Sequence, residues 1–197
     1  MKKLPLPGET VLAFDSGRFA GGKGLNQAVA IHRAGGDVTF QFAVGDDDDG
    51  EFLTNFLSEQ KVVFSRILDS GTATSKAFIL VDQDGENQIA VVPGANYSPK
   101  LREQSFQGGP GLLVLQLEIG NENNLVVAAL AKKAGWKVVL TPAPSSEFDP
   151  KLLEFVDIIT LNETEVTQLA GATDFESAGA ELSKLSIIHL SRRRRRS

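Results

Sequence analysis

The sequence predicts an α/β fold in which a mostly parallel, Rossmann-like sheet is flanked by helices. Short apolar runs alternate with amphipathic stretches along most of the 197 residues, and this alternation is typical of βαβ units. Leu112 to Leu117 form an apolar run, as expected for a strand buried on both faces. Residues 50–60 carry apolar side chains at the three- and four-residue spacing of one helix face.

Each predicted element has its own boundary signal. Helices are expected at 21–34, 50–60, 121–134, 162–170 and 174–185. Strands are expected at 38–44, 62–68, 112–117, 137–140, 156–161 and 186–190. Gly35, Gly135 and Gly171 follow three of the helices, and glycine readily takes the left-handed conformation that ends a helix. Pro142 and Pro144 stop the strand before them, because proline cannot donate to a ladder.

One section departs from this alternation. Residues 74–82 and 87–92 are extended runs joined by Asp82-Gln83-Asp84-Gly85-Glu86, and an Asp-Gly between two β-rich runs indicates a hairpin. The stretch 9–20 has an extended pattern too. We therefore expect a small antiparallel lid, with strands from about 9–20 and 74–93, on a single α/β domain covering 1–190. Residues 191–197 form a basic tail, expected to be unstructured.

Composition excludes several classes of protein. The hydrophobic fraction is 42% and the charged fraction 23%, as in ordinary globular chains. No run approaches the roughly 20 apolar residues of a membrane helix, and the first seven residues lack the apolar region of a signal peptide. The chain has no cysteine, so it has no disulfide or thiol chemistry, and a cytoplasmic location is expected.

The charge is acidic apart from one run. The net charge is −5, and five of the 20 basic residues are Arg192 to Arg196, which leaves 15 basic against 25 acidic residues elsewhere. This acidic body argues against a nucleic-acid binder. We interpret the arginine run as a solvated tail or an altered reading frame, rather than as a site for RNA or a membrane surface.

A glycine-rich helix start, Gly21-Gly22-Lys23-Gly24-Leu25-Asn26-Gln27-Ala28, is the first candidate site. Glycines let the backbone approach a ligand, and a helix N-terminus presents unpaired N–H groups. Lys23 and Asn26 add donors and an amide that suit sugar hydroxyls. The glycine spacing is neither that of a Walker A loop nor that of the dinucleotide fingerprint. By itself, the motif is explained equally well by a tight turn into a helix.

Three further motifs carry polar groups. Glu118 ends the predicted strand that begins at Leu112, where ligands bind in open α/β sheets, although a solvated loop carboxylate is the simpler interpretation. Asn162 and Glu165 form a capping box, and the same two residues suit nucleotide phosphates and Mg²⁺ respectively. The two roles are compatible. The acidic run 46–49 lacks the spacing of a calcium loop and is interpreted as a solvated, helix-capping run.

Taken in order along the chain, these motifs resemble those of the ribokinases in the pfkB family of carbohydrate kinases. The resemblance extends from about Pro7 to about Leu190. It is carried by Pro7-Gly8-Glu9-Thr10, Gly21 to Ala28, Val44-Gly45-Asp46-Asp47, Asp84-Gly85-Glu86-Asn87, Val92-Pro93-Gly94-Ala95-Asn96, Gln116-Leu117-Glu118, Pro142-Ala143-Pro144 and Asn162-Glu163-Thr164-Glu165. The combination points to ribokinases rather than to fructokinases or adenosine kinases.

The resemblance implies ATP-dependent phosphorylation of the 5-hydroxyl of D-ribose, giving ribose 5-phosphate. The residues it implies at the sugar are Gly22, Lys23, Gly24, Asn26 and Glu118. It implies that Asn162 contacts ATP phosphates and that Glu165 organises Mg²⁺. Such a reaction depends on positioning and charge neutralisation. A homodimer formed through the lid is a further expectation.

The resemblance also identifies parts of the family pattern that these residues do not contain. An Ala-Gly-Asp motif, whose Asp takes the proton of the sugar hydroxyl, and a loop for a monovalent cation such as K⁺ would follow Leu190. A central strand bearing Asn-x-Asp would precede Pro7, and Thr141 stands where the family usually has Asn. We therefore expect a fold incomplete at both ends and a chain inactive alone. The alternatives are a sugar-binding or dimerising remnant and a non-functional relic.

Overall fold

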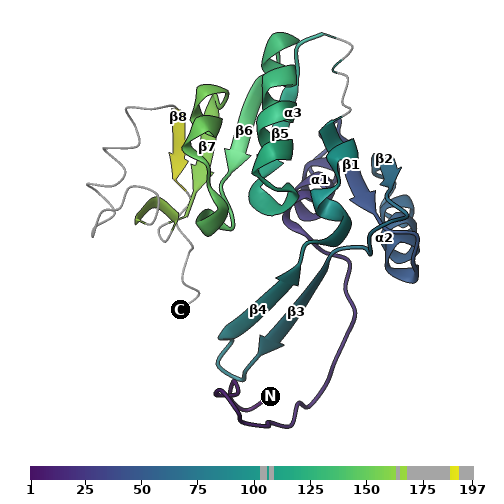
Figure 1. Cartoon of the computed structure of the whole chain (residues 1–197), viewed down its shortest axis with the longest axis vertical. Coiled ribbons are helices and arrows are strands. Elements are labelled where there is room, and N and C mark those ends of the chain that lie inside the picture. Colours follow the sequence, from purple (N-terminus) through teal and green to yellow (C-terminus); the bar gives the residue numbers. More distant parts are fainter. Residues whose placement is uncertain (103–105, 107–108, 163–164, 168–186, 191–197) are drawn as a thin grey trace.

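The computed structural model of the chain describes residues 1–102, 106, 109–162, 165–167 and 187–190 (Figure 1). Within them, the helices are α1 (Lys23–Arg33), α2 (Asp48–Glu59) and α3 (Asn121–Lys133). The strands are β1 (Thr39–Val44), β2 (Val63–Leu68), β3 (Lys76–Val81), β4 (Asn87–Val92), β5 (Leu112–Gln116), β6 (Lys137–Thr141), β7 (Ile158–Leu161) and β8 (Ile187–Leu190). The predicted α/β class is therefore confirmed, with boundaries within two residues at most ends.

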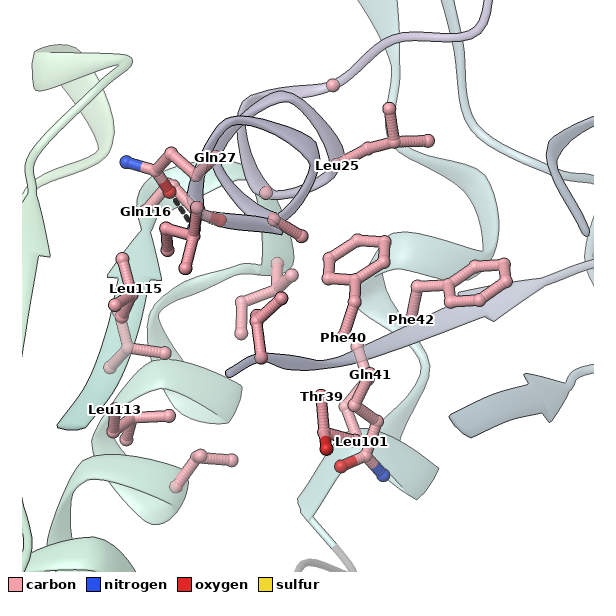
Figure 2. Close-up of a pocket in the computed structure, with 18 of the residues that line it drawn as sticks. Leu25, Gln27, Thr39, Phe40, Gln41, Phe42, Leu101, Leu113, Leu115 and Gln116 are labelled. Atoms are coloured by element: carbon pink, nitrogen blue, oxygen red, sulfur yellow. Dashed lines mark hydrogen bonds between the residues drawn. The ribbon is translucent and has the colours of Figure 1, made fainter. Parts of the chain in front are cut away.

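The parallel strands form two separate groups. β1 pairs with β2, and β5, β6, β7 and β8 form a second sheet in that order, with every pairing in both groups parallel. β1 and β5 are not hydrogen-bonded to each other. Helix α1 packs beside both of these strands and joins the two groups (Figures 1 and 2). The parallel arrangement is as predicted, but the main sheet is divided within the described residues.

The hairpin β3–β4 is antiparallel, as predicted, and projects away from the body of the molecule (Figure 1). Its turn is held by the Asp82 carboxylate, which accepts hydrogen bonds of 3.0 Å from the backbone N–H groups of Asp84 and Glu86. Gly85 has φ +82°, which a residue with a side chain rarely adopts. These local contacts explain why the sequence pattern was sufficient to predict the hairpin.

The prediction of a lid strand at 9–20 is wrong. This stretch forms no strand and pairs with neither strand of the hairpin. The backbone bends at Phe14, and the Asp15 carboxylate accepts a hydrogen bond from the N–H of Ser16. The segment is held instead by Arg18, which pairs with Asp49 on α2 and lies with its guanidinium 4.2 Å from the Phe52 ring centroid. Side-chain contacts to a helix take the place of the expected ladder.

Two main apolar cores stabilise the body. One lies between α3 and the four-stranded sheet and includes Leu140, Leu152 and Leu161, all 1% exposed or less. The other lies between the helices α1 and α2 and strand β1, around Val44 and Leu57. Each half of the molecule therefore buries its own apolar face, as layered α/β proteins do.

The predicted ends of the helices are also found. Gly35 and Gly135 follow the caps of α1 and α3 with φ near +80°, and Asp47 caps α2. The helix predicted at 162–170 is described only at 165–167, where the chain is helical. The helix predicted at 174–185 and the basic tail 191–197 lie outside the described residues. None of the described helices has the length and apolar character needed to span a bilayer.

Candidate functional site

Two of the predicted motifs, the glycine-rich helix start and the strand end at Glu118, meet at the start of α1. The backbone N–H of Lys23 donates a hydrogen bond of 2.7 Å to the carboxylate of Glu118, which lies just beyond β5. Gly22, the N-cap of α1, has φ +102° and presents this N–H to the carboxylate. Two motifs 95 residues apart in the sequence are thereby joined.

The third glycine of the motif makes room for α1 to approach the strands. A Cβ on Gly24 would lie 3.1 Å from Gln116 Oε1 and 3.1 Å from a ring carbon of Phe40. Such contacts are tighter than ordinary van der Waals packing allows. A Cβ on Gly21, by contrast, would meet nothing within 4 Å. The glycines therefore have different roles: Gly22 supplies a backbone conformation and Gly24 supplies space.

A cavity of about 620 Å³ lies between α1, β1 and β5 (Figure 2). Its lining is polar near the start of α1, where Gly22, Gly24, Gln27, Asn96, Gln116 and Glu118 contribute. Of the predicted sugar-site residues, Gly22, Gly24 and Glu118 are in this lining. Lys23 and Asn26 are not in the lining: both belong to the first turn of α1, where Lys23 is partly exposed and Asn26 is exposed. The volume is in the range of small-molecule sites.

A chain of polar side chains crosses the carboxyl ends of three strands. Gln116 Nε2 donates to Gln27 Oε1 over 2.5 Å, and Gln27 Nε2 donates to Thr141 Oγ1 over 3.1 Å. The Thr141 and Thr160 hydroxyls are 2.6 Å apart. These bonds connect α1 with β5, β6 and β7. Gln27 and Thr160 were not predicted as site residues from the sequence, although the positions of Thr141 and Thr160 near strand ends were a signal for them.

The loop after β6 supports the Glu118 segment. The backbone N–H of Leu117 donates to the carbonyl of Ala143 over 3.1 Å, and Ala143 lies within the Pro-Ala-Pro motif. Thr141, which stands where an Asn was expected, uses its hydroxyl in the polar chain described above. The departure from the family pattern at Thr141 therefore has a structural use in this protein.

Asn162 and Glu165 form the predicted capping box at the end of β7. The backbone N–H of Glu165 donates to Asn162 Oδ1, and the backbone N–H of Asn162 donates to Glu165 Oε2, each over 2.9 Å. Both side chains are partly buried. The capping interpretation is confirmed. Because parallel strands end at the same edge of a sheet, Asn162 and Glu118 lie at one edge of the four-stranded sheet.

The described residues contain no cluster of three or more His, Asp or Glu side chains able to enclose a metal ion. Glu165 supplies a single partly buried carboxylate at the end of β7. Mg²⁺ in nucleotide sites keeps several waters and is held mainly by phosphate oxygens with one or two carboxylates. The residues present fit that kind of site and do not fit a metal held by protein ligands alone.

A second polar cluster lies where the hairpin leaves the body. The Asp47 carboxylate accepts from the Gly50 N–H (2.8 Å), and from the hydroxyl (2.6 Å) and N–H (2.8 Å) of Thr74. These bonds, from Thr74 first, lower the pKa of Asp47 below its usual value. The acidic run therefore caps α2 as predicted. It also anchors the hairpin, because Asp49 pairs with both Arg18 and Lys76 on β3.

The structure is that of an α/β protein with parallel strands, an antiparallel β-hairpin and a cavity of small-molecule size between α1, β1 and β5. The family model of pfkB family carbohydrate kinases matches residues 2–189. The ribokinase of Lactococcus lactis is 37% identical over 174 residues, which are 85% of this chain and 57% of that protein. The ribokinase of Haemophilus influenzae is 36% identical over 188 residues, 93% of this chain and 61% of that protein.

The chain belongs to the pfkB family of carbohydrate kinases, and within that family it is ribokinase-like. The solved structure of Arabidopsis thaliana ribokinase complexed with ribose and ATP matches it with a TM-score of 0.74 at 28% identity, covering 97% of this chain and 66% of the other. The chain thus spans about 57–61% of the two curated ribokinases named above. The resemblance predicted from the order of motifs is confirmed.

Proposed function

We propose that this chain supplies the sugar-binding part of an ATP-dependent kinase that phosphorylates the 5-hydroxyl of D-ribose. The observation that carries the proposal is the bond from the Lys23 N–H to Glu118, which joins the glycine-rich helix start to the carboxylate beyond β5. The ligands of the related Arabidopsis thaliana ribokinase, ribose and ATP, support the choice of substrates. A cytoplasmic location belongs to the same proposal.

In this proposal, Glu118 orients the sugar. An ionised carboxylate has two oxygens and about four lone-pair positions, so accepting one N–H leaves capacity for sugar hydroxyls. Lys23 and Asn26, at the exposed helix start, add donors to the same ligand, and the backbone at Gly22 and Gly24 allows it to approach closely. Such positioning is the main contribution a protein makes to phosphoryl transfer.

The nucleotide is proposed to bind at the neighbouring strand end. Asn162 would contact the phosphates of ATP, and Glu165 would hold Mg²⁺ together with phosphate oxygens and water. The metal, when bound, neutralises charge on the phosphates. The capping box orients both side chains, because each is fixed by the other's backbone N–H. The hairpin β3–β4 would act as the lid of the sugar site.

The 197 residues alone are proposed to bind ribose without efficient turnover, because none of the motifs identified in them supplies the Asp base of the family. Losing such a base costs about 10² to 10⁴ in rate. A coupled ADP-release assay on the purified chain tests this point. Ribose-dependent turnover close to that of a complete ribokinase would contradict it.

Ribose binding is tested by calorimetry with Glu118→Gln and the control Glu122→Gln. Removing the charge of Glu118 should weaken ribose binding by about 10-fold or more, since hydrogen bonds to a charged acceptor contribute about 1.5–3 kcal/mol. Glu122 is 81% exposed and pairs with Arg102, so its substitution should leave binding unchanged. Equal effects of the two substitutions would reject the proposed role of Glu118.

A second candidate function, self-association of a non-catalytic chain, is favoured by one observation. Every residue of β3 and β4 is exposed, including Phe78, Ile79, Ile89 and Val91 at 56–60%. One face of a lid can cover a ligand, and the other face is then available to a second copy. Sedimentation of the wild type and of Ile89→Lys distinguishes the cases. A monomer that does not change with concentration would reject self-association.

A further inference from the structure

A single carboxylate on α2 holds two segments that are far apart in the sequence. Asp49, in the first turn of α2, pairs through Oδ1 with Arg18 and through Oδ2, over 2.5 Å, with Lys76, the first residue of β3. The segment before α1 and the hairpin extend to the same side of the body (Figure 1). The start of α2 is therefore a common attachment point for both.

The contact of Arg18 with α2 is more than one ion pair. Its guanidinium also donates a hydrogen bond of 2.9 Å to the carbonyl of Asp48, and it lies 4.2 Å from the centroid of the Phe52 ring. A charge-assisted hydrogen bond and a cation–π contact each restrict the orientation of a guanidinium. Arg18 therefore has a defined position on the helix.

Only a short link joins Arg18 to the predicted sugar-binding residues. Gly22 stands four residues after Arg18, and four extended residues span about 14 Å at most. Ala20, within this link, packs against the core between α1, α2 and β1. The position of Arg18 therefore limits where Gly22 can lie, and with it the neighbouring Lys23 N–H that bonds Glu118.

The base of the hairpin is attached to the same helix. Lys76 lies opposite Val92 at the end of the β3–β4 ladder nearest the body. Its hydrogen bond with Asp49 raises the pKa of the Lys76 ammonium above its usual value. A two-stranded hairpin is only marginally stable by itself, so its position depends on such attachments.

We propose that Asp49 is a positioning residue for the sugar site, which fixes the start of α1 and the base of the hairpin relative to each other. This role rests on the proposed function in so far as the ligand is ribose. Asp49 acts through Arg18 and Lys76 and has no contact with the sugar. Its contribution is to keep the donors at the helix start and the hairpin in one arrangement around the ligand.

The first test measures amide hydrogen exchange by NMR in the ribose-free 197-residue chain. Asp49→Asn should speed exchange about 3-fold or more both at the Lys23 N–H and at the base of β3 and β4, because two exposed ion pairs are lost together. Arg18→Gln should affect only the Lys23 side, and Lys76→Gln only the hairpin. Asp48→Asn is the matched control, since it removes the same charge from the same turn of α2 and leaves both pairs intact.

The exchange pattern also separates positioning from a general effect on α2. An acid in the first turn of a helix stabilises that helix. Faster exchange throughout α2 in Asp49→Asn would show that Asp49 acts only in this way and would overturn the proposal. Unchanged exchange at either the Lys23 N–H or the hairpin base would overturn it too, as would equal effects of Asp49→Asn and Asp48→Asn.

The second test uses the fact that ribose carries no charge. Calorimetry should show ribose binding weakened about 3-fold or more by Asp49→Asn, restored to within about 2-fold by Asp49→Glu, and unchanged by Asp48→Asn. Raising NaCl from about 0.02 M to about 0.5 M should weaken binding to the wild type about 2-fold or more, because it screens the exposed pairs, and should affect Asp49→Asn less. The same salt dependence in both proteins would contradict the role of Asp49. If the wild type binds no ribose, the proposed function is rejected, and the exchange pattern alone decides whether Asp49 positions the two segments.

Discussion

The backbone N–H of Lys23 and the carboxylate of Glu118 are joined by a hydrogen bond of 2.7 Å across 95 residues of sequence. This bond brings the N-terminus of α1 to the carboxyl end of β5. A helix N-terminus carries partial positive charge, and a carboxylate placed there is stabilised. The relationship makes Glu118 a fixed acceptor beside the helix start rather than a solvated loop carboxylate.

Gly24→Ala should lower the free energy of unfolding by about 1 kcal/mol relative to Gly21→Ala, because its Cβ would press on Gln116 and Phe40. Gly21→Ala is the matched control, since its Cβ would enter open space. Urea unfolding of both variants provides the measurement. Ribose binding should weaken in the Gly24 variant, since α1 must shift away from β5. Equal stability of the two variants would contradict the close approach described here.

Asp47→Ala should lower stability at pH 7 by about 1–2 kcal/mol, since it removes the cap of α2 and the acceptor for Thr74. The folded-state pKa of Asp47 lies below its usual value, so its contribution is complete above the unfolded pKa and is lost as pH falls through the folded pKa.

The difference in stability between wild type and Asp47→Ala should therefore shrink below about pH 4. Thermal unfolding from pH 7 to pH 3 measures this, with Asp46→Ala, an exposed neighbouring acid, as the control. A difference that is constant across this range would show that the ionised carboxylate is not responsible.

Thr141→Val and Thr160→Val test the polar chain across the strand ends. Their hydroxyls are 2.6 Å apart, so either single change leaves a partner without its bond and should cost about 1 kcal/mol. The double variant should cost less than the sum of the two, with a coupling energy of about 0.5 kcal/mol or more. A double-variant cycle of chemical unfolding provides the values, and strict additivity would mean that the hydroxyls act independently.

Asn162 substitutions separate the capping role from the proposed role in nucleotide binding. Asn162→Ala removes the acceptor for the Glu165 N–H and should destabilise the chain by about 1 kcal/mol. Asn162→Asp keeps a good cap and should leave stability nearly unchanged, while its negative charge opposes ATP phosphates. Thermal shifts with and without MgATP measure both effects. An Asp variant that MgATP stabilises as strongly as wild type would reject the phosphate contact.

Elements that depend on neighbouring residues were predictable from the sequence. The Asn162–Glu165 capping box, the Asp47 cap and the turn at Gly85 each use side chains within four residues of the groups they bind. The stretch 9–20 was mispredicted because its extended pattern carries no information about a pairing partner. Its position depends on Arg18 reaching Asp49 and Phe52 on α2.

The order of local motifs in the sequence was enough to establish the α/β class, the hairpin and the family, because helix periodicity, turn residues and caps are short-range features. Tertiary structure alone established which motifs meet: Lys23 with Glu118, Gln27 with Gln116 and Thr141, and Asp47 with Thr74. It also established that β1 and β5 do not pair. Strand pairing and side-chain contacts over tens of residues depend on how whole elements pack, and no local pattern records that packing.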